Sequence, residues 1–429
     1  MIFNSSKYNT EWNTKRLSDL GKFQRGKSRH RPRNDSKLFE HGTYPLVQTG
    51  EVKAANLYIR THEACYNDFG LSQSAIWPEN TLCITIAANI AETALLGYPM
   101  CFPDSVVGFN AYPEESSELF MHYVFTYIRK AIQNSASGSI QDNINIEYLT
   151  GLQFKIPHKT YQDKIAEILS SLDNKIELNN RINSELEAMA KTLYEYWFVQ
   201  FDFPDENGKP YKASGGRMVF DSELNREIPM GWTTKSLGEI VDIVKGNVSP
   251  KEVSSSTPYI GLEHIQRKNL ALIDWASSDI AASNKTIFKE GDILFGKIRP
   301  YFHKVTVAPF DGITSTDTLV FRPKSHKLYG LVLEVIFSGE FVEIASQSST
   351  GSKMPRADWN VLKNYPVVIP QDDLLEKFQG LIDKYCKKLK SITIENHELR
   401  NLRDWLLPML MNGQVTVKPS TESKEAQHG

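Results

Sequence analysis

An internal duplication constrains the fold of this chain more than any other feature. A tryptophan, a leucine and a glycine recur at an offset of 220 residues, as Trp12, Leu17 and Gly26 in the first half and as Trp232, Leu237 and Gly246 in the second. Farther along, a Gly-Ser pair and an Ile-Pro dipeptide recur at an offset of 213 residues, at 138–139 and 156–157 and again at 351–352 and 369–370. The period is far longer than the roughly 20–50 residues of a solenoid repeat. The sequence therefore predicts two copies of one globular domain.

A long helical pattern follows each Ile-Pro dipeptide. Residues spaced alternately by four and three form a seam in each pattern, and eight of the ten seam positions are apolar in each. The first seam is Ile165, Leu169, Leu172, Ile176, Asn179, Asn183, Leu186, Ala190, Leu193 and Trp197; the second is Phe378, Ile382, Tyr385, Leu389, Ile392, Asn396, Leu399, Arg403, Leu406 and Leu410. This spacing is typical of a coiled coil, in which a buried Asn specifies register, as Asn183 and Asn396 do at equivalent positions. The alternative is an amphipathic helix on a globular core, but the matched placement favours pairing of the two helices.

The predicted fold class is α+β (mixed), with two repeated globular domains joined by two long helices. Residues 81–87 and 292–296 have the composition of buried strands, and 365–370 that of an edge strand, whereas 118–132 and 328–344 have helical composition. Pro408 should kink or end the second long helix. The predicted segments are a globular domain at 1–157, a helix at 158–200, a connector at 201–218, a second globular domain at 219–370, a helix at 371–412 and a polar, frayed tail at 413–429.

The composition and the motifs indicate a protein without catalytic activity of its own. The chain lacks the phosphate-binding loop, dinucleotide-binding, nucleophile-elbow and zinc-protease motifs. Its four cysteines lack CxxC spacing, and neither a membrane-length apolar run nor a signal peptide is visible, so we expect a cytoplasmic location. The 49 Lys and Arg residues nearly balance the 51 Asp and Glu residues. We therefore expect the isolated chain to bind nucleic acid weakly.

Three kinds of segment are candidates for contact with DNA. The first is a cationic loop containing Lys22, Arg25, Lys27, Arg29, Arg31 and Arg33, whose alternative is a solvated surface loop. The second is 297–304, where strand-like alternation would place Lys297, Arg299, Tyr301 and His303 on one face, next to Lys304; its alternative is a charge-protected edge strand. The third is the repeated Gly-Ser loop, with Ser139, Gln141 and Asn143 in one copy and Ser352, Lys353 and Arg356 in the other; its alternative is a simple turn. Different polar residues on the same frame suit two modules that read different sequences.

The duplicated order of these motifs resembles the specificity (S) subunit of Type I restriction–modification systems. The resemblance covers nearly all of the chain and rests on the opening at 232–238 (WTTKSLG), the Gly-Ser turn before Ile-Pro, the helix at 164–176 (KIAEILSSLDNKI) and the central stretches 196–204 (YWFVQFDFP) and 207–211 (NGKPY). The first copy departs from the pattern, because Ser18 and Asp19 are inserted after Leu17.

The resemblance implies a division of labour between this chain and other subunits. It implies that 1–157 and 219–370 are target recognition domains, each reading one half of a split site on double-stranded DNA, and that an antiparallel coiled coil sets their spacing. The implied partners are two methyltransferase (M) subunits and restriction/motor (R) subunits, with S-adenosylmethionine, ATP and Mg bound on those partners and no cofactor on this chain. Two alternatives stay open: a coiled-coil scaffold with two protein-binding heads, and a specificity subunit of a non-motor restriction system.

Overall fold

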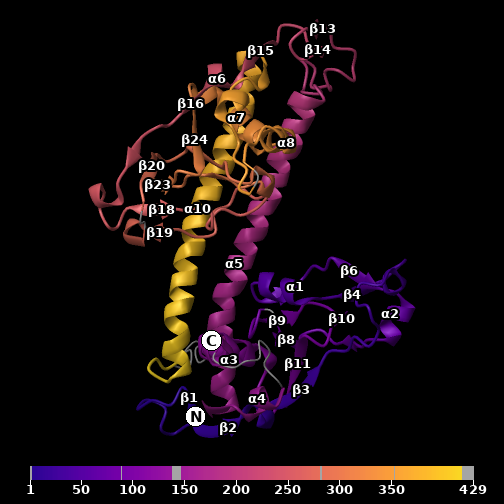
Figure 1. Cartoon of the computed structure of the whole chain (residues 1–429), viewed down its shortest axis with the longest axis vertical. Coiled ribbons are helices and arrows are strands. Elements are labelled where there is room, and N and C mark those ends of the chain that lie inside the picture. Colours follow the sequence, from indigo (N-terminus) through magenta and orange to yellow (C-terminus); the bar gives the residue numbers. More distant parts are fainter. Residues whose placement is uncertain (1, 88, 138–145, 281–282, 352, 418–429) are drawn as a thin grey trace, which may run out of the picture. The chain divides into compact units, whose positions relative to one another are not determined.

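The computed structural model describes residues 2–87, 89–137, 146–280, 283–351 and 353–417. The chain divides into two compact units, of which unit 1 comprises Met1–Glu177 and Leu399–Gly429, and unit 2 comprises Leu178–Glu398. Each unit contains one copy of the duplicated segment together with part of each long helix (Figure 1). We describe each unit by itself.

Unit 1 is built from three small sheets and a covering helix. The five-stranded sheet has the order β3 (Gly21–Arg25), β11 (Val106–Ala111), β8 (Leu82–Thr85), β9 (Thr93–Leu96) and β5 (Tyr58–Ile59). The four-stranded sheet has the order β6 (Ala64–Tyr66), β4 (Tyr44–Leu46), β10 (Met100–Cys101) and β7 (Ile76–Trp77), and the three-stranded sheet has the order β1 (Ile2–Phe3), β12 (Gln153–Ile156) and β2 (Asn13–Arg16). Helix α3 (Glu118–Ser137) packs on β8 and β9, and every residue of β8 is buried. The shorter helices are α1 (Thr49–Ala54), α2 (Asp68–Ser72) and α4 (Ile146–Gly151).

Unit 2 repeats this architecture. One sheet has the order β16 (Val241–Ile243), β24 (Thr318–Pro323), β21 (Ile293–Gly296) and β22 (Val305–Val307). Another has the order β17 (Asn247–Val248), β20 (Lys285–Phe288), β23 (Gly312–Ser315), β18 (Pro258–Ile260) and β19 (Ala276–Ser277). Two pairs complete it, β15 (Thr233–Ser236) with β25 (Pro366–Ile369) and β13 (Met218–Asp221) with β14 (Arg226–Pro229). The helices are α6 (Leu237–Ile240), α7 (Tyr329–Phe337), α8 (Gly339–Gln347) and α9 (Trp359–Leu362).

The sheet topology confirms the predicted duplication. The strand order β3-β11-β8-β9 in unit 1 matches β16-β24-β21-β22 in unit 2. The parallel pair β4 and β10 likewise matches the parallel pair β18 and β23. The strand after each tryptophan pairs with the strand before each Ile-Pro, in the registers Asn13 with Ile156 and Thr233 with Ile369. Strands that are far apart in sequence thus meet at equivalent places in both copies, and the α+β fold class is confirmed.

The two long helices pair in antiparallel orientation. Helix α5 spans Lys159–Tyr194 and continues as a π-helical turn, Glu195–Val199, while α10 spans Asp372–Met411. In unit 2, Asn179 donates to Asn396 at 2.9 Å, and the ring of Trp197 lies 6.0 Å from that of Phe378. Residue numbers therefore rise along α5 as they fall along α10. The contacts confirm the predicted helix pairing and the antiparallel direction that the family resemblance implied.

The asparagines of the two seams are buried as predicted, but Asn183 and Asn396 differ in their hydrogen bonds. Asn396 accepts from Asn179 and donates to Asn180 at 2.9 Å. Asn183 is only 3% exposed, and its Oδ1 has no hydrogen-bond partner in the described part of the chain. The hydrogen bonds of Asn396 fix the register of the coil, because sliding one helix would leave a buried amide without a partner.

Three predicted details need correction. The predicted helix at 328–344 is two helices, because the Ser338 hydroxyl accepts the Phe341 N–H at 3.1 Å and starts α8 as an N-cap. Pro408 does not end α10, which continues to Met411, whereas the kink predicted as its other effect stays a prediction. The tail is not frayed from its start, since Val415 and Val417 pack against the core of unit 1.

Candidate nucleic-acid interface

The cationic loop of unit 1, residues 22–33, begins in strand β3 and then passes next to the segment that connects β10 with β11. Lys22 and Arg25 lie on β3, which pairs with β11. Gly26 donates its N–H to the carbonyl of Val106 at 2.9 Å, and a Cβ at this position would lie 2.3 Å from the carbonyl oxygen of Pro103. Only glycine permits this close approach of two backbones. The close approach brings the cations that follow next to the β10–β11 connection.

Four cations of this loop lack carboxylate partners within the described ranges, namely Lys22, Arg25, Lys27 and Arg29. Of these, Arg25 and Arg29 are exposed and Lys27 is half-buried. Arg33 and Arg31 instead approach Asp104, at 2.6 Å and 3.5 Å. A surface with four unneutralised cations attracts polyanions such as a DNA backbone.

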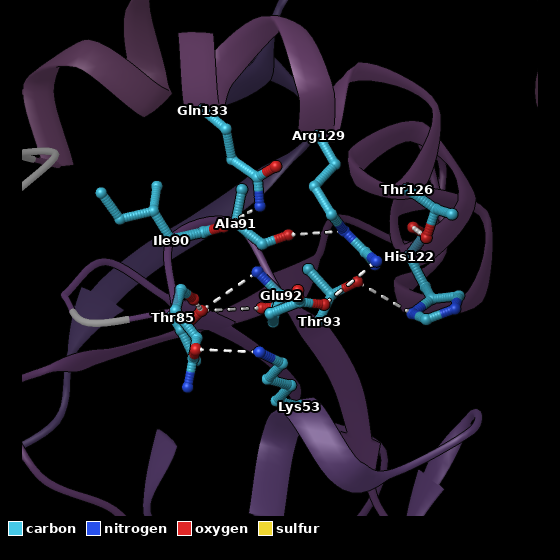
Figure 2. Close-up of polar contacts among 11 residues, drawn as sticks. Lys53, Thr85, Ile90, Ala91, Glu92, Thr93, His122, Thr126, Arg129 and Gln133 are labelled. Atoms are coloured by element: carbon cyan, nitrogen blue, oxygen red, sulfur yellow. Dashed lines mark hydrogen bonds and ion pairs between the residues drawn. The ribbon is translucent and has the colours of Figure 1, made fainter. Parts of the chain in front are cut away.

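In unit 1, side chains of α3 hold the turn that connects the ends of β8 and β9 (Figure 2). Arg129 on α3 donates to the carbonyl of Ala91 at 3.1 Å and forms an ion pair with Glu92 at 3.0 Å. Gln133, also on α3, donates to the carbonyl of Ile90 at 2.9 Å. Ala91 itself has a positive φ of 60°. Polar side chains of α3 therefore hold this turn against that helix.

A buried histidine lies in the same region. His122 Nδ1 is 3.1 Å from the hydroxyl of Thr93, as Figure 2 shows, and burial lowers the pKa of His122 to about 3. The imidazole is therefore neutral at physiological pH, and its hydrogen bond joins α3 to β9. Lys53 on α1 donates to Oδ1 of Asn89 in the same turn at 3.2 Å.

The corresponding turn in unit 2 overturns the predicted strand-like alternation at 297–304. The chain forms a short 3₁₀ turn at Pro300–Phe302, flanked by positive φ angles of 47° at Arg299 and 50° at His303. Proline has no N–H for a strand ladder, and the chain must reverse here because β21 and β22 are antiparallel neighbours. His303 follows β21 as Ala91 follows β8, and both have positive φ. The side chains of this segment therefore do not share one face.

Two of the predicted side chains in this turn have structural partners. His303 Nε2 lies 2.9 Å from the carbonyl of Phe337 on α7, and burial lowers the pKa of His303. Lys304 donates to the carbonyl of Leu262, and burial also lowers its pKa. These contacts hold the β21–β22 turn in place, as Arg129 holds the β8–β9 turn of unit 1. Lys297, Arg299 and the 55% exposed Tyr301 then remain as the candidate reading residues of this turn.

The structure brings this turn together with the residues that follow the Gly-Ser pair of unit 2, which were also predicted to contact DNA. Arg299 donates its N–H to the carbonyl of Pro355 at 2.7 Å, and Ala357 donates its N–H to the carbonyl of Lys297 at 2.9 Å. Arg356 pairs with Asp317 through two contacts, at 2.8 Å and 3.3 Å. Two segments more than fifty residues apart thus form one continuous surface.

Sequence reasoning missed two cations at this surface. The guanidinium of Arg267 lies 3.8 Å from the centroid of the Phe302 ring, a cation–π contact, and Lys268 donates its N–H to the carbonyl of His303 at 2.8 Å. Both side chains are exposed. Two adjacent cations in a polar loop were visible in the sequence, but only the fold places them beside Phe302. We call the following set the unit 2 cationic surface: Arg267, Lys268, Lys297, Arg299, Tyr301, Lys353 and Arg356.

Four predicted site residues, Ser139, Gln141, Asn143 and Ser352, lie outside the described residues. Lys353 is described and is exposed. Within the described ranges, no helix is long and apolar enough to cross a membrane. The same part of the chain contains no group of three or more His, Cys, Asp or Glu side chains that could hold a metal ion.

Comparison with known proteins gives a consistent result. A family described as "Type I restriction modification DNA specificity domain" matches residues 9–188 and 229–403. The chain is 24% identical to the Type I restriction enzyme MjaIX specificity subunit of Methanocaldococcus jannaschii, over 95% of this chain and 94% of that protein. It is 22% identical to the HindI specificity subunit of Haemophilus influenzae, over 89% of this chain and 97% of that protein. The crystal structure of the Type I restriction–modification S subunit from M. genitalium is similar in fold, with a TM-score of 0.57 and 17% identity over 96% of this chain and 99% of that chain.

Proposed function

Because this chain belongs to the family of Type I restriction modification DNA specificity domains, we propose that it is the DNA-recognition subunit of a Type I restriction–modification complex. The observation that carries the proposal is the repetition of one sheet framework with different surface side chains. The β8–β9 turn of unit 1 carries Asn89 and Glu92, whereas the β21–β22 turn of unit 2 carries Lys297 and Arg299. Two such modules would read two different half-sites, so the complete site is bipartite and asymmetric.

The physical basis of recognition would have two parts. Unpaired cations such as Arg25 and Arg29 neutralise phosphates, which supplies affinity without sequence information. Guanidinium and amide groups reach base edges in the major groove, where each base pair presents a distinct pattern of donors and acceptors. The coiled coil with its asparagine-fixed register would hold the spacing of the two half-sites constant.

Partner subunits would perform the chemistry. In this proposal two methyltransferase subunits bind S-adenosylmethionine and methylate adenine, while restriction/motor subunits use ATP and Mg for translocation and cleavage. The near-neutral charge of this chain supports such an arrangement, because much of the phosphate-neutralising charge must then come from the partners. The names of the relatives, which are specificity subunits of Type I restriction enzymes, support it as well.

The cationic loop yields a prediction on salt dependence. Replacing Arg25, Lys27 and Arg29 together by alanine should weaken binding to specific and random DNA alike. It should also reduce the slope of log K against log salt by about 3, since each lost phosphate contact removes about 0.9. A salt-titrated binding assay with the assembled complex measures both quantities. The matched control replaces three exposed cations of the connector, Lys209, Lys212 and Arg217, and should leave the slope unchanged.

An exchange of one globular domain tests the proposed function itself. Residues 1–157 are replaced by the corresponding domain of another specificity subunit, and the bound sequences are selected from a random duplex library. We expect one half of the selected motif to change while the other half and the spacer are retained. Loss of both halves, or binding without any sequence preference in the unmodified complex, would contradict the proposal.

A further inference from the structure

An aspartate occupies the same connection in both units and approaches an arginine from a distant loop. The strands β10 and β11 of unit 1 correspond to β23 and β24 of unit 2 in the sheet order. Asp104 lies between β10 and β11 and pairs with Arg33 at 2.6 Å. Asp317 lies between β23 and β24 and pairs with Arg356 at 2.8 Å. The two aspartates therefore lie between corresponding strands of the two sheets, whereas their arginines come from segments that do not correspond.

The geometry of the unit 2 pair leaves part of the guanidinium free. Asp317 accepts from Nε of Arg356 at 2.8 Å and from Nη2 at 3.3 Å, and Nη1 lies 3.5 Å from the carbonyl of Met354. The hydrogen bond to Asp317 raises the pKa of Arg356. A guanidinium has five N–H donors, so the edge formed by Nη1 and the second N–H of Nη2 faces away from the carboxylate. The side chain of Arg356 is 47% exposed, and among the described residues this edge has only the long contact of Nη1 with Met354.

In unit 1, Arg33 is the better candidate of the two arginines near Asp104. Arg31 directs Nη1 to the carbonyls of Ser28 at 2.5 Å and His30 at 2.8 Å, and its contact with Asp104 is long, at 3.5 Å. Within the described ranges, the Arg33 side chain makes one hydrogen bond, from Nη2 to Asp104 at 2.6 Å, and it is 50% exposed. Arg31 is therefore committed to its own loop, whereas Arg33 retains most of its donors.

Stability alone is a weak reason for these pairs. A solvent-exposed ion pair contributes about 0–1 kcal/mol, because water screens it and two long side chains lose entropy. The same restriction favours binding. Because the arginine side chain is already ordered in the free protein, it loses less conformational entropy when it binds a ligand. A carboxylate beside the arginine also repels phosphates, which disfavours contacts that lack a matching base.

We propose that Asp317 and Asp104 are positioning residues that hold Arg356 and Arg33 ready to read a guanine, one in each half-site. Guanine presents O6 and N7 side by side in the major groove and accepts two parallel N–H groups, which the free edge of a guanidinium supplies. The ligand of each arginine is thus the Hoogsteen edge of a G·C pair. This inference rests on the proposed function and adds which residues determine specificity.

The test measures base discrimination by the complete complex. Selection from a random library first defines the motif of the unmodified complex, and dissociation constants are then measured for duplexes with single base-pair changes. Asp317→Asn should reduce discrimination at one G·C pair of one half-site by about tenfold. Affinity for random DNA should be unchanged or higher, because a negative charge has been removed. Asp104→Asn should act in the same way on a G·C pair of the other half-site only.

A double-mutant cycle separates positioning from a merely structural role. Arg356→Lys keeps the charge but loses the planar fork, so it should reduce discrimination at the same base pair as Asp317→Asn. The double variant should lose no more discrimination than either single variant. The control is Asp242→Asn, an exposed aspartate 3.8 Å from Lys324, which should leave the motif unchanged. The inference is overturned if Asp317→Asn lowers binding equally at every base pair, or if the two variants affect different base pairs. If Asp317→Asn does not fold, Arg356→Lys decides, because unchanged discrimination in that variant is also contradictory. A failure of the proposed function looks different, since the unmodified complex would then select no motif.

Discussion

Replacing Asp173 by alanine should destabilise unit 1 by about 3–5 kcal/mol, the usual cost of removing one partner of a buried ion pair. Asp173 lies on α5 and its side chain is only 2% exposed. It accepts from the hydroxyl of Tyr123 on α3 and from Nη1 of Arg403 on α10, both at 2.7 Å. One carboxylate therefore joins both long helices to the globular core of the unit. Its removal leaves Arg403 with one carboxylate partner among the described residues, its neighbour Asp404 at 2.9 Å.

Urea unfolding of the full chain, followed by circular dichroism and by tryptophan fluorescence, measures this effect. The matched control is Asp163→Ala on the same helix, because Asp163 pairs with Lys159 at 2.6 Å on the surface. An exposed pair of this spacing is worth about 0.3–0.5 kcal/mol, so the control should change little. Asp173→Asn should fall between the two, since the amide oxygen still accepts from Tyr123. A loss below about 1 kcal/mol for Asp173→Ala would contradict the buried-pair account.

Replacing Glu334 by glutamine should stabilise unit 2, increasingly so as the pH rises. Glu334 on α7 is only 2% exposed, and its Oε1 has no hydrogen-bond partner among the described residues. Burial, and to a smaller extent the charge of Glu187 on α5, raise the pKa of Glu334 to about 8. The folded state therefore keeps a proton that the unfolded chain releases above its ordinary pKa of about 4.5. Because the folded state binds more protons, the free energy of unfolding falls as the pH rises from about 4.5 to about 8.

Glutamine removes this titration and keeps the shape of the side chain. The gain in unfolding free energy should be close to zero near pH 4.5 and reach the order of 3–5 kcal/mol at pH 8. Urea unfolding at several pH values gives the difference between the two chains. Glu343→Gln on α8 is the control, because Glu343 is exposed and should give a small difference with little pH dependence. A variant that is less stable than the unmodified chain at pH 8 would show that ionised Glu334 has a stabilising partner.

The duplication and the helix pairing were predictable because both leave long-range periodic signals in the sequence. The alternation of Lys297, Arg299 and Tyr301 was misleading, since a short local pattern does not reveal that Pro300 lies where antiparallel strands reverse. Arg403 looked like an exception in an apolar seam, and the fold explains it by the carboxylate of Asp173.

Contacts between distant loops left no such signal. The stacking of Arg267 on Phe302 and the pairing of Arg356 with Asp317 each join residues more than thirty positions apart. Nothing in their local sequence specifies the partner. The duplicated domains and the paired helices were therefore predictable from the sequence. The contacts that orient the surface side chains became visible only in the folded structure.

Whether this chain directs methylation can be decided by a genome-wide map of methylated adenines in cells that contain the chain and its partner methyltransferase. If the chain reads DNA for that enzyme, the map shows a gapped, asymmetric motif that disappears when the chain is deleted and returns when it is restored. A methylome that is unchanged by the deletion would contradict the account.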